Sequence, residues 1–175
     1  RPMSSLGDAC LRRGNLAQAL DYYQRALAIQ EHRALEERVK RLLEEGERAE
    51  LRHIGGPGVR VMIDLLSGTD PDIREKAGWA LVENVEISAK PAMVSLTSHA
   101  DPGVRWCAAK WLGALGSSPE VPALTPLLSD AFPEIREAAA EAFQQIRDSS
   151  ALPSLIPLLS DIDPHVREAA VQALA

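Results

Sequence analysis

The sequence is dominated by a segment that recurs every 31 residues in its second half. Each copy keeps a proline, a branched apolar residue, an arginine and an alanine at fixed spacing. The prolines are Pro71, Pro102, Pro133 and Pro164, the arginines are Arg74, Arg105, Arg136 and Arg167, and the alanines are Ala77, Ala108, Ala139 and Ala170. Self-similarity at a period of this length is typical of repeat architectures, so it constrains the fold strongly.

Each repeat unit contains two apolar segments, and each is long enough for a helix. The first segment begins at proline, whose missing N–H costs nothing in a first helical turn, and its apolar positions follow the helical period. Asp70, Asp101 and Asp163 precede these prolines and are suited to cap the helices. The third copy has Phe132 instead, so either Asp130 supplies its cap or the cap is weaker. The second segments carry Leu65, Leu96, Leu127 and Leu158, again 31 residues apart.

Such units fold only by stacking, because one helix pair cannot bury its apolar face alone. Aromatic residues make up only 4% of the chain, so alanine and leucine supply the core. Small core residues favour closely packed helices over a sandwich or barrel. The sequence therefore predicts an all-α fold, a right-handed α-solenoid of stacked antiparallel helix pairs.

The recurring Asp-Pro-x-[Val/Ile]-Arg-x-x-Ala core resembles HEAT-like repeats, in the short form also seen in the phycobilin lyase family. We assign residues 57–175 to such repeats. The repeated arginines, Arg74, Arg105, Arg136 and Arg167, have a functional interpretation as an anion site. We favour a structural arginine ladder, in which each side chain pairs with loop aspartates or carbonyls between units.

The front of the chain does not follow the 31-residue pattern. Residues 1–31 combine a Leu6-Gly7 pair, a Gly14-Asn15 turn and a later Ala-Tyr-Ala-Leu pattern, which resembles one tetratricopeptide (TPR) helical hairpin without its usual first tryptophan and closing proline. Residues 32–56 are highly charged with one apolar stripe, and predict a solvated linking helix that ends at Gly55-Gly56.

Net charge and cysteine content restrict the classes of partner. A net charge of −6 disfavours nucleic-acid binding, which needs a basic face. No apolar run approaches the roughly 20 residues of a membrane span. Cys10 and Cys107 lie far apart, so we expect reduced thiols and a cytoplasmic location. The chain starts at Arg1 without methionine and stops in a helical pattern, so we expect it to be a piece of a larger protein.

The residues that commonly carry chemistry form no recognisable constellation, so we expect no enzyme activity, no metal and no cofactor. The histidines, His32, His53, His99 and His165, lack metal-ligand spacing. No His-Glu pair of the kind that holds iron in HEAT-repeat deoxyhypusine hydroxylases occurs. Cys107 has no evident base and aligns with alanine in two other units. The alternatives to a protein-binding scaffold are a bilin-lyase-like cofactor handler and a structural spacer.

Two tryptophans interrupt a stripe that is otherwise polar. Trp106 replaces glutamate at one stripe position, and Trp79 replaces a polar residue one turn further on in the preceding unit. Because neighbouring helices pack about 8–10 Å apart, the two indoles can form one patch. We predict that Trp79 and Trp106, with Lys110 beside them, dock a partner protein. The structural alternative is that the curvature of the solenoid, or neighbouring segments outside this sequence, buries the two indoles within the protein itself.

Trp111 differs from the other two tryptophans, because it aligns with alanines and is expected to fill core volume, with Gly113 making room for it. A second candidate surface is the concave face. We expect that face to be formed by the helices of the second segments, whose small residues include Ser67, Ser95, Thr97 and Ser98.

Overall fold

The computed structural model describes residues 3–47, 50–51, 53–83 and 87–175, and every regular element within these ranges is a helix. The helices stack into an α-solenoid, so the predicted all-α fold is confirmed. None of the described helices combines the length and the apolar character that a membrane crossing requires.

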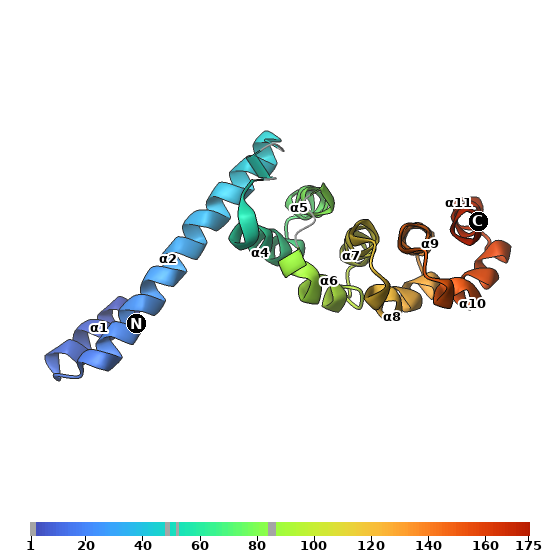
Figure 1. The fold of residues 1–175 in the computed structure, drawn as a ribbon. Helices are drawn as coiled ribbons and strands as arrows, with labels where there is room; N and C mark the ends of the chain where they lie inside the picture. The colour runs from blue at the N-terminus through green and yellow to red at the C-terminus, as the bar shows by residue number, and fades with distance from the viewer. Residues whose placement is uncertain (1–2, 48–49, 52, 84–86) are drawn as a thin grey trace.

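Two rows of helices form the solenoid (Figure 1). One row consists of α5 (Pro71–Glu83), α7 (Pro102–Leu115), α9 (Pro133–Ile146) and α11 (Pro164–Leu174), which begin at the recurring prolines. The other row consists of α4 (Gly55–Leu66), α6 (Lys90–Leu96), α8 (Val121–Leu124) and α10 (Leu152–Leu155), joined by short 3-10 helices. These 3-10 helices are η1 (Ile87–Ala89), η2 (Ser118–Glu120), η3 (Thr125–Ser129), η4 (Ser149–Ala151) and η5 (Ile156–Ser160).

The row of α5, α7, α9 and α11 lies on the inner side of the arc (Figure 1). The expectation that the second segments form the concave face is therefore wrong. The inner row is drawn together by small residues: a Cβ atom at Gly113 of α7 would lie 2.7 Å from the Cα atom of Ala142 of α9. Gly113 thus makes room for the neighbouring helix rather than for Trp111. Close spacing on one side bends the stack toward that side.

Prolines shorten the helices of the outer row. Pro126 and Pro157 lie inside the second segments of the last two units, where α8 and α10 give way to η3 and η5. Proline has no N–H to donate and its ring clashes with the carbonyl four residues earlier, so the α-helix cannot continue there. Ser95 occupies the corresponding position of α6, which runs on to Leu96.

The front of the chain contains a hairpin of α1 (Met3–Arg12) and α2 (Leu16–Glu45). Gly14 makes the turn at a φ of 76°, and the Asn15 side chain accepts a hydrogen bond from the N–H of Gln18. The α2 helix continues without interruption through residue 31, and it ends at Gly46, whose φ is 75°, rather than at Gly55. Gly55 instead opens α4. The TPR-like assignment of residues 1–31 stays a prediction.

Three of the four units have the predicted aspartate cap, and the third unit does not. The Oδ1 atoms of Asp70, Asp101 and Asp163 accept hydrogen bonds from N–H groups in the first turns of α5, α7 and α11. Phe132 begins α9 without a side-chain cap. Asp130 accepts a hydrogen bond from the N–H of Phe132, which precedes the first turn of α9. The weaker cap is therefore the alternative that the structure supports.

The recurring arginines lie where successive units meet. The Nε and Nη2 atoms of Arg105 donate to the two carboxylate oxygens of Asp130, at 2.7 and 3.0 Å. Arg136 binds Asp161 in the same way, at 2.8 and 2.7 Å. The Nη1 atoms of both arginines donate to carbonyls of their own loops. Each of these guanidinium groups thus joins its own loop to the next unit.

The two ends of the ladder depart from this geometry. His99 stands where the next units have Asp130 and Asp161, and its Nδ1 accepts the same turn hydrogen bond, here from Asp101 N–H, at 3.1 Å. Without a carboxylate at position 99, Arg74 reaches Asp101 instead, through Nη1 alone at 3.3 Å. Arg167 binds only the carbonyls of Asp161 and Ile162 among the described residues. The arginine–aspartate contact between the units of α5 and α7 is therefore the weakest contact of the ladder.

We predict that Asp161→Asn lowers the free energy of unfolding at pH 7 by about 1–3 kcal/mol, because it leaves the largely buried Arg136 without its charged partner. The Arg136 hydrogen bonds hold the pKa of Asp161 below its ordinary value. The carboxylate therefore stabilises the fold above the unfolded-state pKa of about 4, and this stabilisation is lost as the pH falls through the folded-state pKa. Urea denaturation at pH 7 and at pH 3 should show the variant's deficit shrinking at the lower pH.

The matched control is Asp21→Asn. Asp21 pairs with Arg25 at 3.1 Å on α2, but both side chains are at least half exposed. Exposed pairs of this kind contribute at most about 0.5 kcal/mol, so this variant should unfold like the wild type. Equal losses in the two variants would contradict a special role for the ladder.

Candidate functional site

The two tryptophans of the polar stripe lie in contact on the inner row. Trp79 of α5 and Trp106 of α7 have ring centroids 4.8 Å apart, and their planes meet at 66°, an edge-to-face arrangement. Trp79 is 45% exposed, whereas Trp106 is half-buried and packs against the core. We call these two side chains the tryptophan pair.

The tryptophan pair borders a hollow between α5 and α7. This hollow has a volume of about 200 Å³, and its lining includes Glu75, Gly78 and Cys107 together with both indoles. Trp79 also borders a second hollow of about 180 Å³ between α2 and α5, which is lined by Leu43 and Leu51 among others. Trp79 therefore stands as a wall between two small, mainly apolar recesses.

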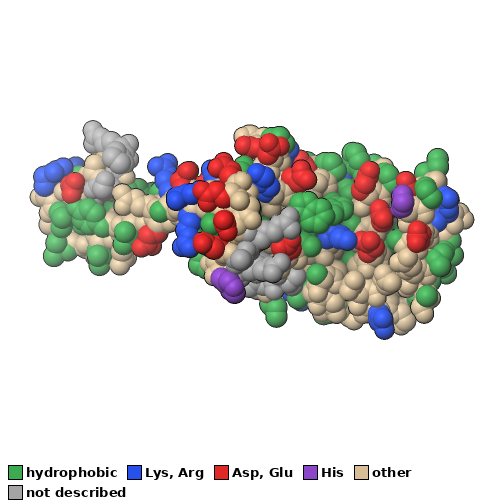
Figure 2. Space-filling model, turned by 90° about the horizontal axis from the view of Figure 1, so that it is seen from above, with side chains coloured by type: hydrophobic (Ala, Val, Ile, Leu, Met, Phe, Trp, Pro, Cys, Tyr) green, Lys and Arg blue, Asp and Glu red, His purple; other side chains and the backbone are tan. Residues whose placement is uncertain are grey.

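Figure 2 looks down on the inner row and shows hydrophobic side chains gathered over α5 and α7, with acidic side chains on both sides. Isolated exposed apolar side chains are common, but two large aromatic rings in contact beside recesses form a patch. The tryptophan pair and the concave face were separate candidates in the sequence, and in the structure they coincide.

Lys110 lies one turn beyond Trp106 on α7, but its charge is engaged elsewhere. Its Nζ donates to the Oε2 atom of Glu141 on α9, at 2.6 Å. The structure therefore brings Trp79 and Trp106 together and places Lys110 at the rim, tied to the next unit.

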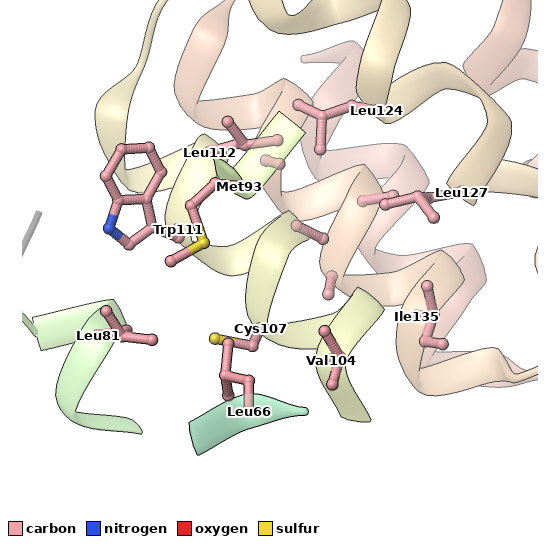
Figure 3. Close-up of a cluster of buried hydrophobic side chains, with 14 of the residues drawn as sticks. Leu66, Leu81, Met93, Val104, Cys107, Trp111, Leu112, Leu124, Leu127 and Ile135 are labelled. Atoms are coloured by element: carbon pink, nitrogen blue, oxygen red, sulfur yellow. The ribbon is translucent and has the colours of Figure 1, made fainter. Parts of the chain in front are cut away.

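Trp111 is fully buried, in the same cluster as Met93 and Leu112 (Figure 3). Its Nε1 has no hydrogen-bond partner among the residues that the structure describes, which is a cost that its packing must offset. Trp111 thus fills core volume and takes no part in the exposed surface.

Cys107 is buried beneath the tryptophan pair. Its Sγ points toward Leu66 (Figure 3), and the thiol donates to the carbonyl of Gly78 at 3.4 Å. Burial raises the pKa of the Cys107 thiol to about 12, so it is protonated at neutral pH. Cys107 therefore packs as a small side chain in the floor of the hollow.

An ion pair that the sequence did not reveal supports the outer row. Glu120 is buried and contacts both Lys90 Nζ and the Ser117 hydroxyl. Burial alone would raise the pKa of Glu120, but the hydrogen bonds from Lys90 and Ser117 outweigh it, so the pKa lies below its ordinary value. This pair clamps α6 to η2 and is a structural element. No group of three or more His, Cys, Asp or Glu side chains in the described ranges is arranged to hold a metal ion.

We predict that the three tryptophans differ in optical behaviour. Trp79→Phe should remove most of the emission that acrylamide quenches, and Trp79→Phe or Trp106→Phe should each remove an exciton couplet in the far-ultraviolet circular dichroism spectrum, because the two rings are in contact. Trp111→Phe is the matched control and should remove only shielded, blue-shifted emission. A Trp79 signal as shielded as that of Trp111 would contradict the exposed pair.

We predict that one thiol reacts quickly and the other only on unfolding. With a pKa of about 12, Cys107 has on the order of one thiolate in ten thousand molecules at pH 8, and its sulfur is buried. Ellman's reagent at pH 8 should titrate the partly exposed Cys10 alone, and a second thiol should appear only in urea. Cys10→Ser, the control, should abolish the fast phase. Two fast phases in the wild type would show that the α5–α7 junction opens readily.

Comparison with known proteins places the repeats in a family. The family model for HEAT repeats matches residues 59–128 and 121–175, about two-thirds of the chain. A search of curated proteins returned no match.

Solved structures share the fold. In the complex of CpcE and CpcF of phycocyanin lyase from Nostoc sp. PCC7120, one chain is 18% identical, with a TM-score of 0.66 over 81% of this chain and 99% of that one. An engineered protein is 25% identical, with a TM-score of 0.57 over 79% of this chain and 71% of that one. A designed armadillo repeat protein in complex with the peptide (KR)4 is 18% identical, with a TM-score of 0.52 over 98% of this chain and 85% of that one.

The family match covers the units that carry the Asp-Pro caps and the arginine ladder, and the solved structures share the stacked helical arrangement. The chain belongs to the HEAT repeat family.

Proposed function

We propose that this chain is a protein-interaction module, a scaffold or regulatory segment of a larger cytoplasmic protein. It holds a segment of a partner protein on the inner face of the solenoid, at the tryptophan pair. HEAT repeats and similar solenoids are protein-interaction scaffolds as a class, which supports the general function. The free thiols of Cys10 and Cys107 suit a reducing compartment.

The tryptophan pair is the single observation that carries the proposal. Tryptophan is among the residues that most often dominate binding energy at interfaces, especially where neighbouring side chains exclude water. Trp79 offers an indole that is nearly half exposed, held in place by its contact with Trp106. Lys110 and Glu141 form a polar rim beside it.

The recesses beside the pair suit side chains better than a cofactor. Each has a volume of about 200 Å³ or less, whereas pockets for drug-sized ligands usually have about 300–1,000 Å³. A larger hollow of about 760 Å³ lies between α2 and α4, but it carries Glu31 and Asp64 as well as His32 and Arg60. This mixed charge disfavours the anionic propionates of a bilin, so the similarity to phycocyanin lyase supports the fold and not that chemistry.

The designed armadillo repeat protein gives a precedent for the mode of binding. Its solenoid resembles this chain and it was solved with a bound peptide. Solenoids present their curved faces to extended segments of other chains, which is the mode proposed here.

The test is capture of partners by the immobilised chain, with quantitative mass spectrometry, followed by affinity measurement on each partner that is retained. Trp79→Ala combined with Trp106→Ala should weaken binding by at least about 30-fold, since hot-spot residues contribute about 2 kcal/mol or more. Phe132→Ala is the matched control, because Phe132 is an aromatic residue with the same exposure, 46%, elsewhere on the solenoid. Partners that bind the double variant as tightly as the wild type would contradict the proposal.

A further inference from the structure

We infer that the segment held at the tryptophan pair is basic. It places a lysine or arginine side chain against the exposed Trp79 indole with its charge facing Glu75, which lines the same hollow, and a second basic side chain faces Glu137 on α9, farther along the stripe. This inference rests on the proposed function and names the chemistry of its partner.

The accessible indole is a receptor for a cation. The face of a tryptophan ring attracts Lys and Arg side chains that approach within about 6 Å of its centre. Trp106 meets Trp79 edge to face and is itself half-buried, so the pair leaves Trp79 as the ring that a partner reaches. The contact also fixes the orientation of Trp79, which reduces the entropy lost on binding.

Along the polar stripe of the inner row, carboxylates outnumber basic side chains, and Glu75 borders the same hollow as Trp79. The position of Trp106 is occupied in the other units by Glu75, Glu137 and Glu168, and the position of Trp79 by Lys110, Glu141 and Gln172. Lys110 and Glu141 neutralise each other at 2.6 Å. Glu75, Glu137 and Glu168 form no ion pair within the described residues, so the stripe keeps a net negative charge.

The arginines near the pair do not cancel this charge. Arg74 lines the same hollow as Glu75, but it contacts Asp101 and the carbonyl of Gly68. Arg105 is engaged by both oxygens of Asp130. In the hollow on the other side of Trp79, Lys76 is opposed by Glu44 and Glu83.

Other chemistries fit this surface less well. An acidic segment or a nucleic acid would meet like charge, which costs affinity and slows association. A purely apolar segment would cover Glu75 without pairing it, and an unpaired carboxylate is costly to bury. A segment that alternates basic and other side chains satisfies both the ring and the carboxylates.

The experiment uses the 175-residue chain and three fluorescein-labelled octapeptides, with fluorescence anisotropy as the readout. The basic peptide alternates arginine and serine, the acidic one alternates glutamate and serine, and the apolar one alternates leucine and serine. We expect the basic peptide to bind at least tenfold more tightly than either of the others, and its binding to weaken as salt is raised from 0.05 M to 0.3 M, as screening requires.

The variants separate the ring from the carboxylates. Trp79→Leu keeps an apolar side chain but removes the aromatic face. It should weaken binding of the basic peptide by about twofold to fivefold, which corresponds to cation–π contributions of about 0.5–1 kcal/mol. Glu75→Gln with Glu137→Gln should weaken it further and flatten the salt dependence. Glu31→Gln is the control, because it removes an exposed charge on α2, away from the tryptophan pair, and it should leave binding of the basic peptide unchanged. Circular dichroism melting verifies that each variant is folded.

The outcomes distinguish the two levels of the argument. The inference of a basic partner is overturned if the basic peptide still binds both Trp79→Leu and the paired glutamate variant as tightly as the wild type. It is also overturned if the leucine–serine peptide binds as tightly as the basic one. Absence of basic-peptide binding, while captured partners still depend on the tryptophan pair, overturns the inference and leaves the proposed function intact. Partners that ignore the tryptophan pair overturn the proposed function itself.

Discussion

The bidentate arginine–aspartate contact is the interaction on which the geometry of this solenoid depends. A guanidinium group is planar and presents its donors at fixed angles, so an arginine that binds its own loop with Nη1 and the next loop with Nε and Nη2 fixes both loops. Arg105 and Arg136 do this with side chains that are 13–15% exposed, where water competes little. These contacts fix how the unit of α7 meets the unit of α9, and how the unit of α9 meets that of α11.

The small residues of the inner row complete this constraint. Because Gly113 has no side chain, α9 can approach α7 until Ala142 fills the space, and the core needs few large aromatic side chains. The two tryptophans of the stripe, Trp79 and Trp106, are then not required for filling the core, unlike Trp111, which is buried in it. Because the units pack without needing the Trp79 ring, its exposure on the surface needs another explanation.

The sequence predicted the parts of the fold that depend on the repeat, because the same residue types recur at the same positions in several units. The Asp-Pro helix starts and the alignment of Trp111 with buried alanines are of this kind. The continuous α2 helix was missed, because no helix breaker lies between Leu16 and Glu45 and the expected boundary at residue 31 came from a resemblance alone. Pro126 and Pro157 carried a readable signal for the broken outer helices.

The candidate site was harder to predict than the fold, because its parts come from contacts between units. Sequence alignment placed Trp79 and Trp106 on one stripe, but the hollow between α2 and α5 depends on how the end of α2 packs against the first inner helix. The concave face was assigned to the wrong row, because curvature is set by the relative spacing of two rows, which no single unit records.

The weakest arginine–aspartate contact and the tryptophan pair both occur where the unit of α5 meets the unit of α7. His99 replaces the aspartate that would bind Arg74, and Arg74 makes a single longer contact with Asp101 instead. An edge-to-face aromatic pair contributes about 0.5–1.5 kcal/mol beyond its buried area, which is comparable to the hydrogen bond that this junction forgoes. The ring contact therefore has a structural role in holding α5 to α7.

That role requires only the ring surfaces that meet, and it leaves the 45% exposure of Trp79 unexplained. A polar residue at this position would have been the soluble choice, as in the other units, which have Lys110, Glu141 and Gln172 there. The exposed remainder of the indole, beside Glu75 and above a hollow, is the part of the structure that packing does not account for, and it is the part that we propose a partner recognises.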